Sequence, residues 1–287
     1  MGKLLRVGTT LLVVAVAIAA GTWVWNHYLY SPWTRDGRIR ADVITIAPDV
    51  SGWVTDLAVS NHQTVKKGDV LFHIDDTRYK AAITEAKAKV EQQRIAWELA
   101  KHQYQRRQQL SGRQAISEED LDTYRINTES AKAAYTLAQA QLYAAQIDLN
   151  RTEVVAPEDG TISNLTLREG NYVTRGNAVL SLIKSGSFYV TGYFEETKLQ
   201  LVHDGQKARI RLMGGDQTLT GTVSSISKGI ADSNTSSNNQ MLPQVQQAFN
   251  WVRLAQRIPV DIALDPVPED VHISAGMTVS IYLGDEE

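Results

Sequence analysis

A long uncharged apolar segment opens the chain. The 19 residues from Val7 to Trp25 carry no charge, and a helix of that length, at about 1.5 Å per residue, just spans a hydrocarbon core of roughly 30 Å. Lys3 and Arg6 precede the segment, which by the positive-inside bias places the N-terminus in the cytoplasm. The pattern predicts one transmembrane anchor, with the rest of the chain outside the cytoplasm.

An aromatic belt follows this segment, as is typical of the point where a membrane span meets the headgroup region. Its members are Trp23, Trp25, Tyr28 and Trp33. The stretch Ala17-Ile18-Ala19 leaves a second interpretation open, because small residues at this spacing also mark the cleavage site of a secretory signal peptide. The apolar residues and the belt continue past that site, which favours the anchor.

A second pattern lies between Pro48 and Pro157, a stretch without proline. Here mostly apolar residues recur every three or four positions. This spacing predicts two long helices with coiled-coil seams. The first seam consists of Tyr79, Ile83, Ala86, Val90, Gln93, Trp97, Ala100, Tyr104 and Arg107. The second seam consists of Leu121, Tyr124, Thr128, Ala131, Tyr135, Ala138, Leu142, Ala145 and Leu149. If the chain folds back near Gln114, large side chains of one seam meet small ones of the other, which favours an antiparallel hairpin.

The turn between the two helices carries its own signals. Gly112 suits the C-cap of a helix, and Ser117, followed by three acidic residues, suits the start of the next helix. Ala115 and Ile116 add apolar surface to the hairpin tip, residues 108–120. A long hairpin is either a spacer or an arm whose tip makes a contact, and both interpretations stay open on these residues alone.

The segments on either side of the helical stretch are similar to each other. The sequence APDVSGWV from Ala47 is echoed by APEDGTI from Ala156. The sequence VKKGDVLF from Val65 is echoed by VTRGNAVL from Val173. In both copies turns with glycine alternate with short strands. Two interleaved halves of this kind predict one small β-sandwich that the helical hairpin interrupts.

Composition, charge and residue spacing argue against several kinds of binding site and catalytic site. A net charge of -3 with no basic excess disfavours nucleic-acid binding. The absence of cysteine excludes disulfides, cysteine metal sites and a thiol nucleophile. The six histidines lack the spacing of metal ligands, and no segment is typical of a nucleophile elbow or a phosphate loop. We therefore expect no enzyme activity, no metal and no cofactor.

The order of these parts resembles the membrane fusion proteins, or periplasmic adaptors, of the haemolysin-secretion D type. The resemblance covers essentially the whole chain. The segment 188–199, followed by Gly205-Gln206, is similar to the strand and short helix that open the family's β-barrel domain. The segment 250–260 is similar to the branch that exports hydrophobic drugs and aromatic carboxylic acids. The two β halves look like those of lipoyl or biotinyl carriers, but the hairpin replaces the turn that holds their modified lysine, so no attached cofactor is expected.

The resemblance implies an elongated, multi-domain α+β fold. It would contain an N-terminal transmembrane helix, a lipoyl-like β-sandwich interrupted by an antiparallel coiled-coil α-hairpin, and a C-terminal β-barrel domain. The expected parts are a cytoplasmic stub and anchor at 1–33, a linker or first barrel strand at 34–45, lipoyl-like halves at 46–75 and 154–184, the hairpin at 76–153, and the barrel domain at 185–287 with a mobile loop at 231–243.

The resemblance also implies a function and partners. The chain would be a single-pass inner-membrane protein with its bulk in the periplasm, acting as the adaptor of a tripartite efflux pump. It would join an inner-membrane transporter to an outer-membrane duct and assemble with further copies of itself into a ring. The branch implies small, amphipathic, aromatic or anionic substrates. A non-transport envelope tether and an adaptor for polypeptide secretion are the alternatives.

In this family an Arg, a Leu four residues later and a Ser seven residues after that mark the hairpin end that contacts the duct. Arg106, Leu110 and Ser117 have this spacing. Structural roles are open for two of them, since Leu110 could close the seam and Ser117 could cap the second helix. Those roles can coexist with a contact at the duct.

Overall fold

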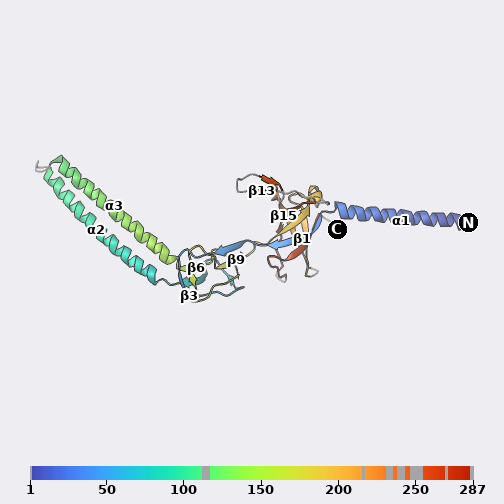
Figure 1. Cartoon of the computed structure of the whole chain (residues 1–287), viewed down its shortest axis with the longest axis horizontal. Coiled ribbons are helices and arrows are strands. Elements are labelled where there is room, and N and C mark those ends of the chain that lie inside the picture. Colours follow the sequence, from blue (N-terminus) through green and yellow to red (C-terminus); the bar gives the residue numbers. More distant parts are fainter. Residues whose placement is uncertain are drawn as a thin grey trace. The chain divides into compact units, whose positions relative to one another are not determined.

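The computed structural model contains two compact units, which we describe separately (Figure 1). Residues 1–42 and 186–287 form the first unit, and residues 43–185 form the second. The structure describes residues 2–111, 117–214, 217–230, 235–237, 243–245, 255–268 and 271–284. The chain thus leaves the first unit once, builds the second, and returns to complete the first.

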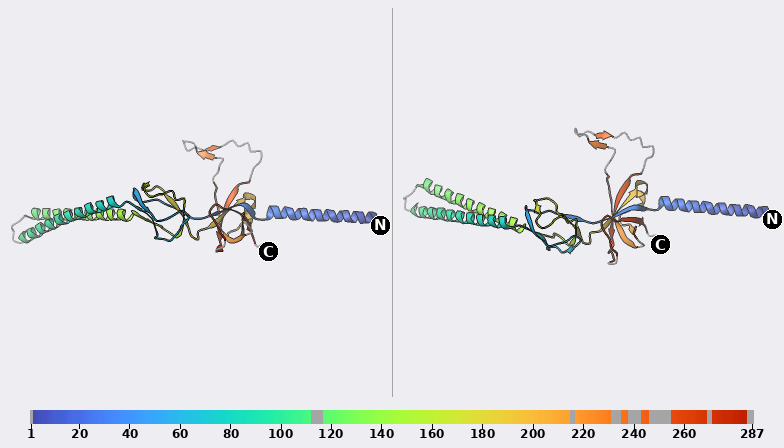
Figure 2. Two further views of the ribbon diagram at one scale, coloured as in Figure 1. Left: turned by 90° about the horizontal axis from the view of Figure 1, so that it is seen from below. Right: turned by 60° about the horizontal axis from the view of Figure 1, so that its bottom comes forward.

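Six strands of the first unit close into an antiparallel β-barrel (Figure 2). Their order around the barrel is β1 (Trp33–Arg40), β10 (Tyr189–Glu195), β15 (Arg257–Leu264), β12 (Thr218–Ile226), β11 (Lys207–Leu212) and β16 (Thr278–Leu283). Strand β1 precedes the second unit in the sequence, whereas the other five strands follow it. The predicted β-barrel domain is confirmed, and its closure depends on this N-terminal strand.

Two glycines let the barrel core close around one isoleucine. Gly37 of β1 and Gly192 of β10 lie opposite each other, and a Cβ atom at either position would lie 2.6 Å from Cδ1 of Ile281. Carbon atoms in contact prefer a separation of about 3.5–4.0 Å, so a side chain at either glycine would displace Ile281. Alternate strand residues complete the core: Ile39, Val190, Phe194, Ile210, Val260, Ile262 and Val279.

Short elements accompany the barrel. The 3-10 helix η1 (Glu196–Leu201) follows β10 directly, which confirms the strand and short helix expected at 188–199. Strands β13 (Thr235–Ser237) and β14 (Pro243–Val245) pair with each other and overlap the range predicted as a mobile loop, 231–243. The other residues of that range, and residues 250–254 of the C-terminal signature, lie outside the described part of the chain.

The second unit contains two four-stranded antiparallel sheets around one hydrophobic core. The first sheet has the order β2 (Val43–Ile46), β9 (Leu180–Lys184), β7 (Gly160–Ser163) and β4 (Thr64–Val65). The second has the order β6 (Glu153–Val155), β5 (Val70–Ile74), β3 (Gly52–Leu57) and β8 (Tyr172–Val173). Each sheet takes two strands from either side of the hairpin, so the two half motifs interleave as predicted.

The repeated turns of the two halves have the same backbone conformation. Gly68 and Gly176 have φ angles of 90° and 80°, in the left-handed region that glycine adopts at no steric cost. Between the sheets, Leu71 and Phe72 of the first half and Ile162 and Leu182 of the second are fully buried. The internal similarity seen in the sequence is therefore a similarity of turns and core positions.

The helices α2 (Thr77–Ser111) and α3 (Glu118–Asn150) form an antiparallel pair that is inserted into the β-sheets of the second unit between β5 and β6 (Figure 2). Pairing of Phe72 with Val154 and of His73 with Glu153 places the helix ends next to each other. The Asp75 carboxylate accepts hydrogen bonds from the Thr77 hydroxyl at 2.6 Å and its backbone N–H at 2.9 Å. These bonds lower the pKa of Asp75. The predicted helical hairpin is confirmed.

Helix α1 (Gly2–Tyr30) covers the segment predicted as an anchor. Among the residues that the structure describes, no helix combines the length and the apolar character of a membrane span. The predicted transmembrane helix is therefore not confirmed. The side chains of Trp23, Trp25 and Tyr28 lie outside the described part of the chain, whereas Trp33 is the first residue of β1.

Candidate interaction surfaces of the helical hairpin

The interface between α2 and α3 uses the predicted seams. In α2 the partly buried residues are the nine predicted positions, from Tyr79 to Arg107, together with Arg94. In α3 they are the nine predicted positions, from Leu121 to Leu149, together with Ala134. Ala138 has the lowest exposure of the set, at 2%. The seam prediction is confirmed, and every other described side chain of the pair faces outward.

Three contacts across the seam fix its register. The Thr128 hydroxyl donates to the Ala100 carbonyl oxygen at 3.1 Å, which matches the antiparallel order of the two predicted seams. The rings of Trp97 and Tyr135 stack with centroids 5.6 Å apart. Near the tip, the Arg107 guanidinium lies 4.8 Å from the centroid of the Tyr124 ring. These contacts therefore fix the axial register of α2 against α3 along most of the hairpin.

The ion pairs of the hairpin lie beside the seam. Arg94 binds Glu91 through two hydrogen bonds of 2.6 and 2.9 Å and Glu98 through one of 2.5 Å. The hydrogen bonds with Arg94 lower the pKa of Glu91. In α3, Arg125 binds Asp122 and Glu129 in the same i, i+3 and i, i+4 pattern, and the hydrogen bond with Asp122 is the main cause that raises the pKa of Arg125. These charged rows stabilise single helices and remain in solvent.

On the side of α3 that faces away from the seam, seven residues spaced three or four positions apart carry no charge. We call these residues the α3 outer stripe: Ile126, Ser130, Ala133, Leu137, Ala140, Ala144 and Ile147, all of which are exposed. The corresponding side of α2 contains apolar residues at Ala88, Ile95 and Leu99, also exposed. We call its row the α2 outer stripe: Ala81, Glu85, Ala88, Gln92, Ile95, Leu99 and His102. Rows with coiled-coil spacing that do not serve the internal seam are typical of further helix packing.

A shallow groove of about 740 Å³ lies alongside the seam. Small, polar and charged residues of both helices line it, among them Ala82, Ala86, Ala145, Glu85, Lys89 and Gln141. Small residues let another backbone approach closely. The groove therefore connects the α2 outer stripe, through Glu85, Ala88 and Gln92, to the line where the two helices meet.

The tip residues predicted as the duct contact have different positions. Ser117 is the N-cap of α3, and its hydroxyl accepts a hydrogen bond from the backbone N–H of Asp120 at 3.1 Å. Leu110 is 37% exposed. It follows the last predicted seam position, Arg107, by three residues, where a four-residue step would be due, so it flanks the seam. Arg106 is exposed one turn below Leu110 on the same side of α2. Gly112, Ala115 and Ile116 lie outside the described residues.

Arg106 and Leu110 thus present a guanidinium and an apolar side chain one turn apart near the end of α2, and Ser117 caps the start of α3. Among the described residues, no group of three or more His, Asp or Glu side chains could hold a metal ion.

Comparisons with known proteins place these features in a family. Residues 42–184 match the family model of the barrel-sandwich hybrid domain of RND membrane fusion proteins. Residues 187–284 match the model of the AAEA-like beta-barrel domain. The uncharacterized protein YdhJ of Escherichia coli (strain K12) is 43% identical over 282 residues, which are 98% of this chain and 99% of that protein.

Solved structures show the same fold. The membrane fusion protein Spr0693 from Streptococcus pneumoniae R6 superposes with a TM-score of 0.65 at 18% identity, covering 90% of this chain and 100% of that one. A MacA-MexA chimeric protein, containing the Pseudomonas aeruginosa MexA alpha-hairpin domain, superposes with a TM-score of 0.61 at 22% identity, covering 88% of this chain and 81% of that one. At these identities the likeness is one of architecture.

Proposed function

We propose, because the chain belongs to the membrane fusion protein family of periplasmic adaptors, that it is the adaptor subunit of a tripartite efflux pump. It would link an inner-membrane transporter to an outer-membrane duct and carry out no catalysis itself. The observation that supports this most directly is the closed hairpin inserted into an interleaved β-sandwich. A hairpin with a fully used internal seam is stable without a partner and can present its tip to another protein.

The contact with the duct would involve Arg106 and Leu110. Both side chains are exposed on one side of α2 and lie within two turns of its end. Neither is one of the predicted seam positions, so the seam pattern alone does not account for their residue types. An arginine can bind carbonyl or carboxylate groups of the partner, and the adjacent leucine can bury apolar area. Ser117 would act indirectly, by capping α3 and fixing the end of the turn.

Self-association would use the two outer stripes. When identical hairpins stand side by side at one level, α2 of one copy runs antiparallel to α3 of the next, in the register that joins Ala100 to Thr128. At that level Ile95 would meet Ala133 and Leu99 would meet Ser130. At the lower end of the hairpin Ala81 would meet Ile147. These three pairs join a large residue to a small one, as in the internal seam, whereas Gln92 would meet Leu137 and His102 would meet Ile126. The coiled-coil spacing of both stripes supports a second copy of the chain as the occupant. Because α2 meets α3, the contact is heterologous and can close a ring.

The N-terminus would anchor the chain in the inner membrane, with residues before Val7 in the cytoplasm and the two compact units in the periplasm. The support is the uncharged sequence from Val7 to Trp25, preceded by Lys3 and Arg6. Leu11, Val13, Val16 and Ile18 are exposed side chains of α1. Membrane fractionation with N-terminal sequencing tests this. Retention of residues 1–19 in membrane-bound protein is expected, and a mature chain that begins after Ala19 would establish the signal peptide instead.

Small aromatic or anionic compounds are the proposed substrates. The support is sequence similarity at 250–260 to the drug and aromatic acid branch. Residues 250–254 lie outside the described chain, and β15 begins at Arg257. Tolerance of cells to benzoate-like acids, measured with and without the chain, tests the substrate class.

Affinity purification of the full chain from cross-linked cell envelopes tests the adaptor role. A transporter and a duct should purify with the wild-type chain. Arg106→Asp and Leu110→Asp should reduce the duct and leave the transporter. Thr136→Asp, exposed on α3 away from the tip, is the matched control and should reduce neither. Purification of the chain with envelope components but no transporter would favour a passive tether, and purification with a secreted polypeptide would favour polypeptide secretion.

A further inference from the structure

An exposed aromatic pair lies on the outer face of the sheet β6-β5-β3-β8 in the second unit. Trp53 of β3 and Tyr172 of β8 are opposite each other in the strand register, and they are 56% and 51% exposed. Their rings meet edge to face, with centroids 5.2 Å apart. The next residues of the two strands, Val54 and Val173, belong to the buried core, so Trp53 and Tyr172 point away from it. Two large apolar rings therefore stand in solvent.

The internal repeat of the chain shows that the fold does not require aromatic residues at these positions. The other sheet contains the equivalent pair, Thr64 of β4 opposite Thr161 of β7. In the alignment of the two halves, Thr161 corresponds to Trp53 and Thr64 to Tyr172. The sandwich thus folds with threonines at one pair of positions and with aromatic residues at the other. Exposed tryptophan and tyrosine are typical of protein interfaces, so the aromatic pair is a candidate contact.

A groove of about 390 Å³ opens between strands β2 and β6. Each of these strands stands at one end of the order of its sheet, so the groove separates two sheet edges. Its lining residues Asp49 and Arg151 form an ion pair with each other. Glu153, which also lines it, is exposed and can accept a hydrogen bond from an indole N–H or a phenol hydroxyl. Apolar residues make up most of the remaining lining: Ile44, Ile46, Pro48, Val154, Val155 and Pro157.

The groove and the aromatic pair lie on opposite sides of the hairpin base. Strand β6 follows α3, and its neighbour β5 precedes α2. Strand β3 lies beyond β5, and the Trp53 carbonyl oxygen accepts a hydrogen bond from the backbone N–H of Asp75, two residues before α2, at 2.8 Å. The order across the base is therefore groove, α3, α2 and aromatic pair. Side-by-side hairpins with α2 of one copy against α3 of the next would bring the aromatic pair of the first copy next to the groove of the second.

We propose that Trp53 and Tyr172 of one copy dock into the groove between β2 and β6 of the neighbouring copy. The inference rests on the proposed side-by-side assembly and adds a second contact to it, at the sandwich. The groove and the aromatic pair are different surfaces, so the contact is heterologous. Each copy offers its aromatic pair to one neighbour and its groove to the other, an arrangement that can close a ring.

Photo-crosslinking of the full chain in cells tests the docking. Tyr172→p-benzoylphenylalanine keeps a ring at this position, and we expect a dimer adduct in which the cross-linked peptide contains residues 153–157 of the second copy. Thr64→p-benzoylphenylalanine is the matched control, because Thr64 is exposed at the equivalent position of the other sheet, and it should give no adduct with the groove. Adducts of position 172 that never include the groove, or adducts with the groove from both positions alike, would overturn the proposal.

Sedimentation velocity of the full chain in detergent gives a second measurement. Trp53→Thr/Tyr172→Thr introduces the residue types of the other sheet and should lower the association constant by about tenfold or more, because the contact would bury the exposed halves of two aromatic rings. Val155→Asp, in the groove, should have a similar effect. Combining all three substitutions should weaken association by less than the product of the separate effects, because both variants remove the same contact. Thermal unfolding verifies the fold of each variant. Fully multiplicative effects, or an unchanged association constant in Trp53→Thr/Tyr172→Thr, would refute the docking.

Failure of this contact and failure of the proposed function give different results. An adduct between two copies from position 137, in cells where position 172 yields none, would exclude the sandwich contact and leave the hairpin contact in place. Co-purification of the duct depends on the hairpin tip and is tested separately with Arg106→Asp and Leu110→Asp.

Discussion

Replacing Leu137 with alanine should weaken self-association of the chain and leave its fold intact. Leu137 is the central large residue of the α3 outer stripe and is 61% exposed in the single chain. Complete burial of a leucine side chain contributes about 1.5–3 kcal/mol, so covering its exposed part in a neighbouring copy contributes about 1–2 kcal/mol. This corresponds to a decrease of roughly 5–30-fold in the association constant for each contact between copies.

The assay is sedimentation velocity of the full chain in detergent over a series of protein concentrations. Gln146→Ala is the matched control, because Gln146 is exposed on the same helix and no residue three or four positions from it belongs to the outer stripe. It should change association by less than about twofold, since surface substitutions outside contacts have effects below about 0.5 kcal/mol. Both variants should unfold at the wild-type temperature. Equal association of Leu137→Ala and wild type, or equal weakening by both variants, would refute the outer stripe as the contact.

Three further predictions concern stability. Gly192→Ala should destabilise the barrel by about 1–3 kcal/mol because its Cβ would lie 2.6 Å from Cδ1 of Ile281; chemical denaturation measures this, and an unchanged midpoint would contradict the packing described. Ala138→Leu should lower the melting temperature of the hairpin by overfilling its most buried seam position, whereas a melt by circular dichroism that matches wild type would disprove the close seam. The pKa of Glu91 is lowered in the folded chain, so its pair with Arg94 should stabilise the hairpin at pH values above the ordinary carboxyl pKa. That stabilisation should disappear as the pH falls through the pKa that Glu91 has in the folded chain. Glu91→Gln should therefore lose less thermal stability than wild type between pH 7 and pH 3, and an identical loss would exclude this contribution.

The helical hairpin could be predicted from sequence because its burial depends on one local periodicity. Each seam residue is set by its neighbours three and four positions away, so the positions from Tyr79 to Leu149 can be read without knowing the rest of the fold. The α3 outer stripe has the same local signal. The uncharged spacing from Ile126 to Ile147 could have been found by continuing the search beyond the first seam.

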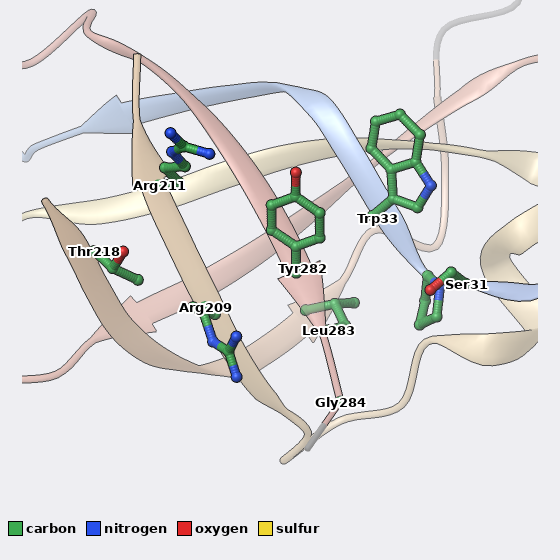
Figure 3. Close-up of a pocket in the computed structure, with 9 residues that line it drawn as sticks. Ser31, Trp33, Arg209, Arg211, Thr218, Tyr282, Leu283 and Gly284 are labelled. Atoms are coloured by element: carbon green, nitrogen blue, oxygen red, sulfur yellow. The ribbon is translucent and has the colours of Figure 1, made fainter. Parts of the chain in front are cut away.

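The stacking of Trp33 on Tyr282 at the barrel surface (Figure 3) could not be predicted in this way. Trp33, Arg209 and Tyr282 come from strands separated by long stretches of sequence and meet only through the register of a closed sheet. The sequence placed Trp33 in an aromatic belt, but its stacking with Tyr282 depends on β1 completing the barrel. Pairs of this kind follow from topology, and strand spacing alone does not indicate them.

Photo-crosslinking from position 110 in intact cells tests the central claim most directly. Leu110→p-benzoylphenylalanine places the reactive group at the proposed duct contact, and the same substitution at Leu137 serves as the internal reference. The account predicts an adduct with an outer-membrane duct from position 110 and an adduct between two copies of the chain from position 137. Adducts from position 110 with the chain itself alone, in cells where position 137 still yields the dimer, would contradict the adaptor function.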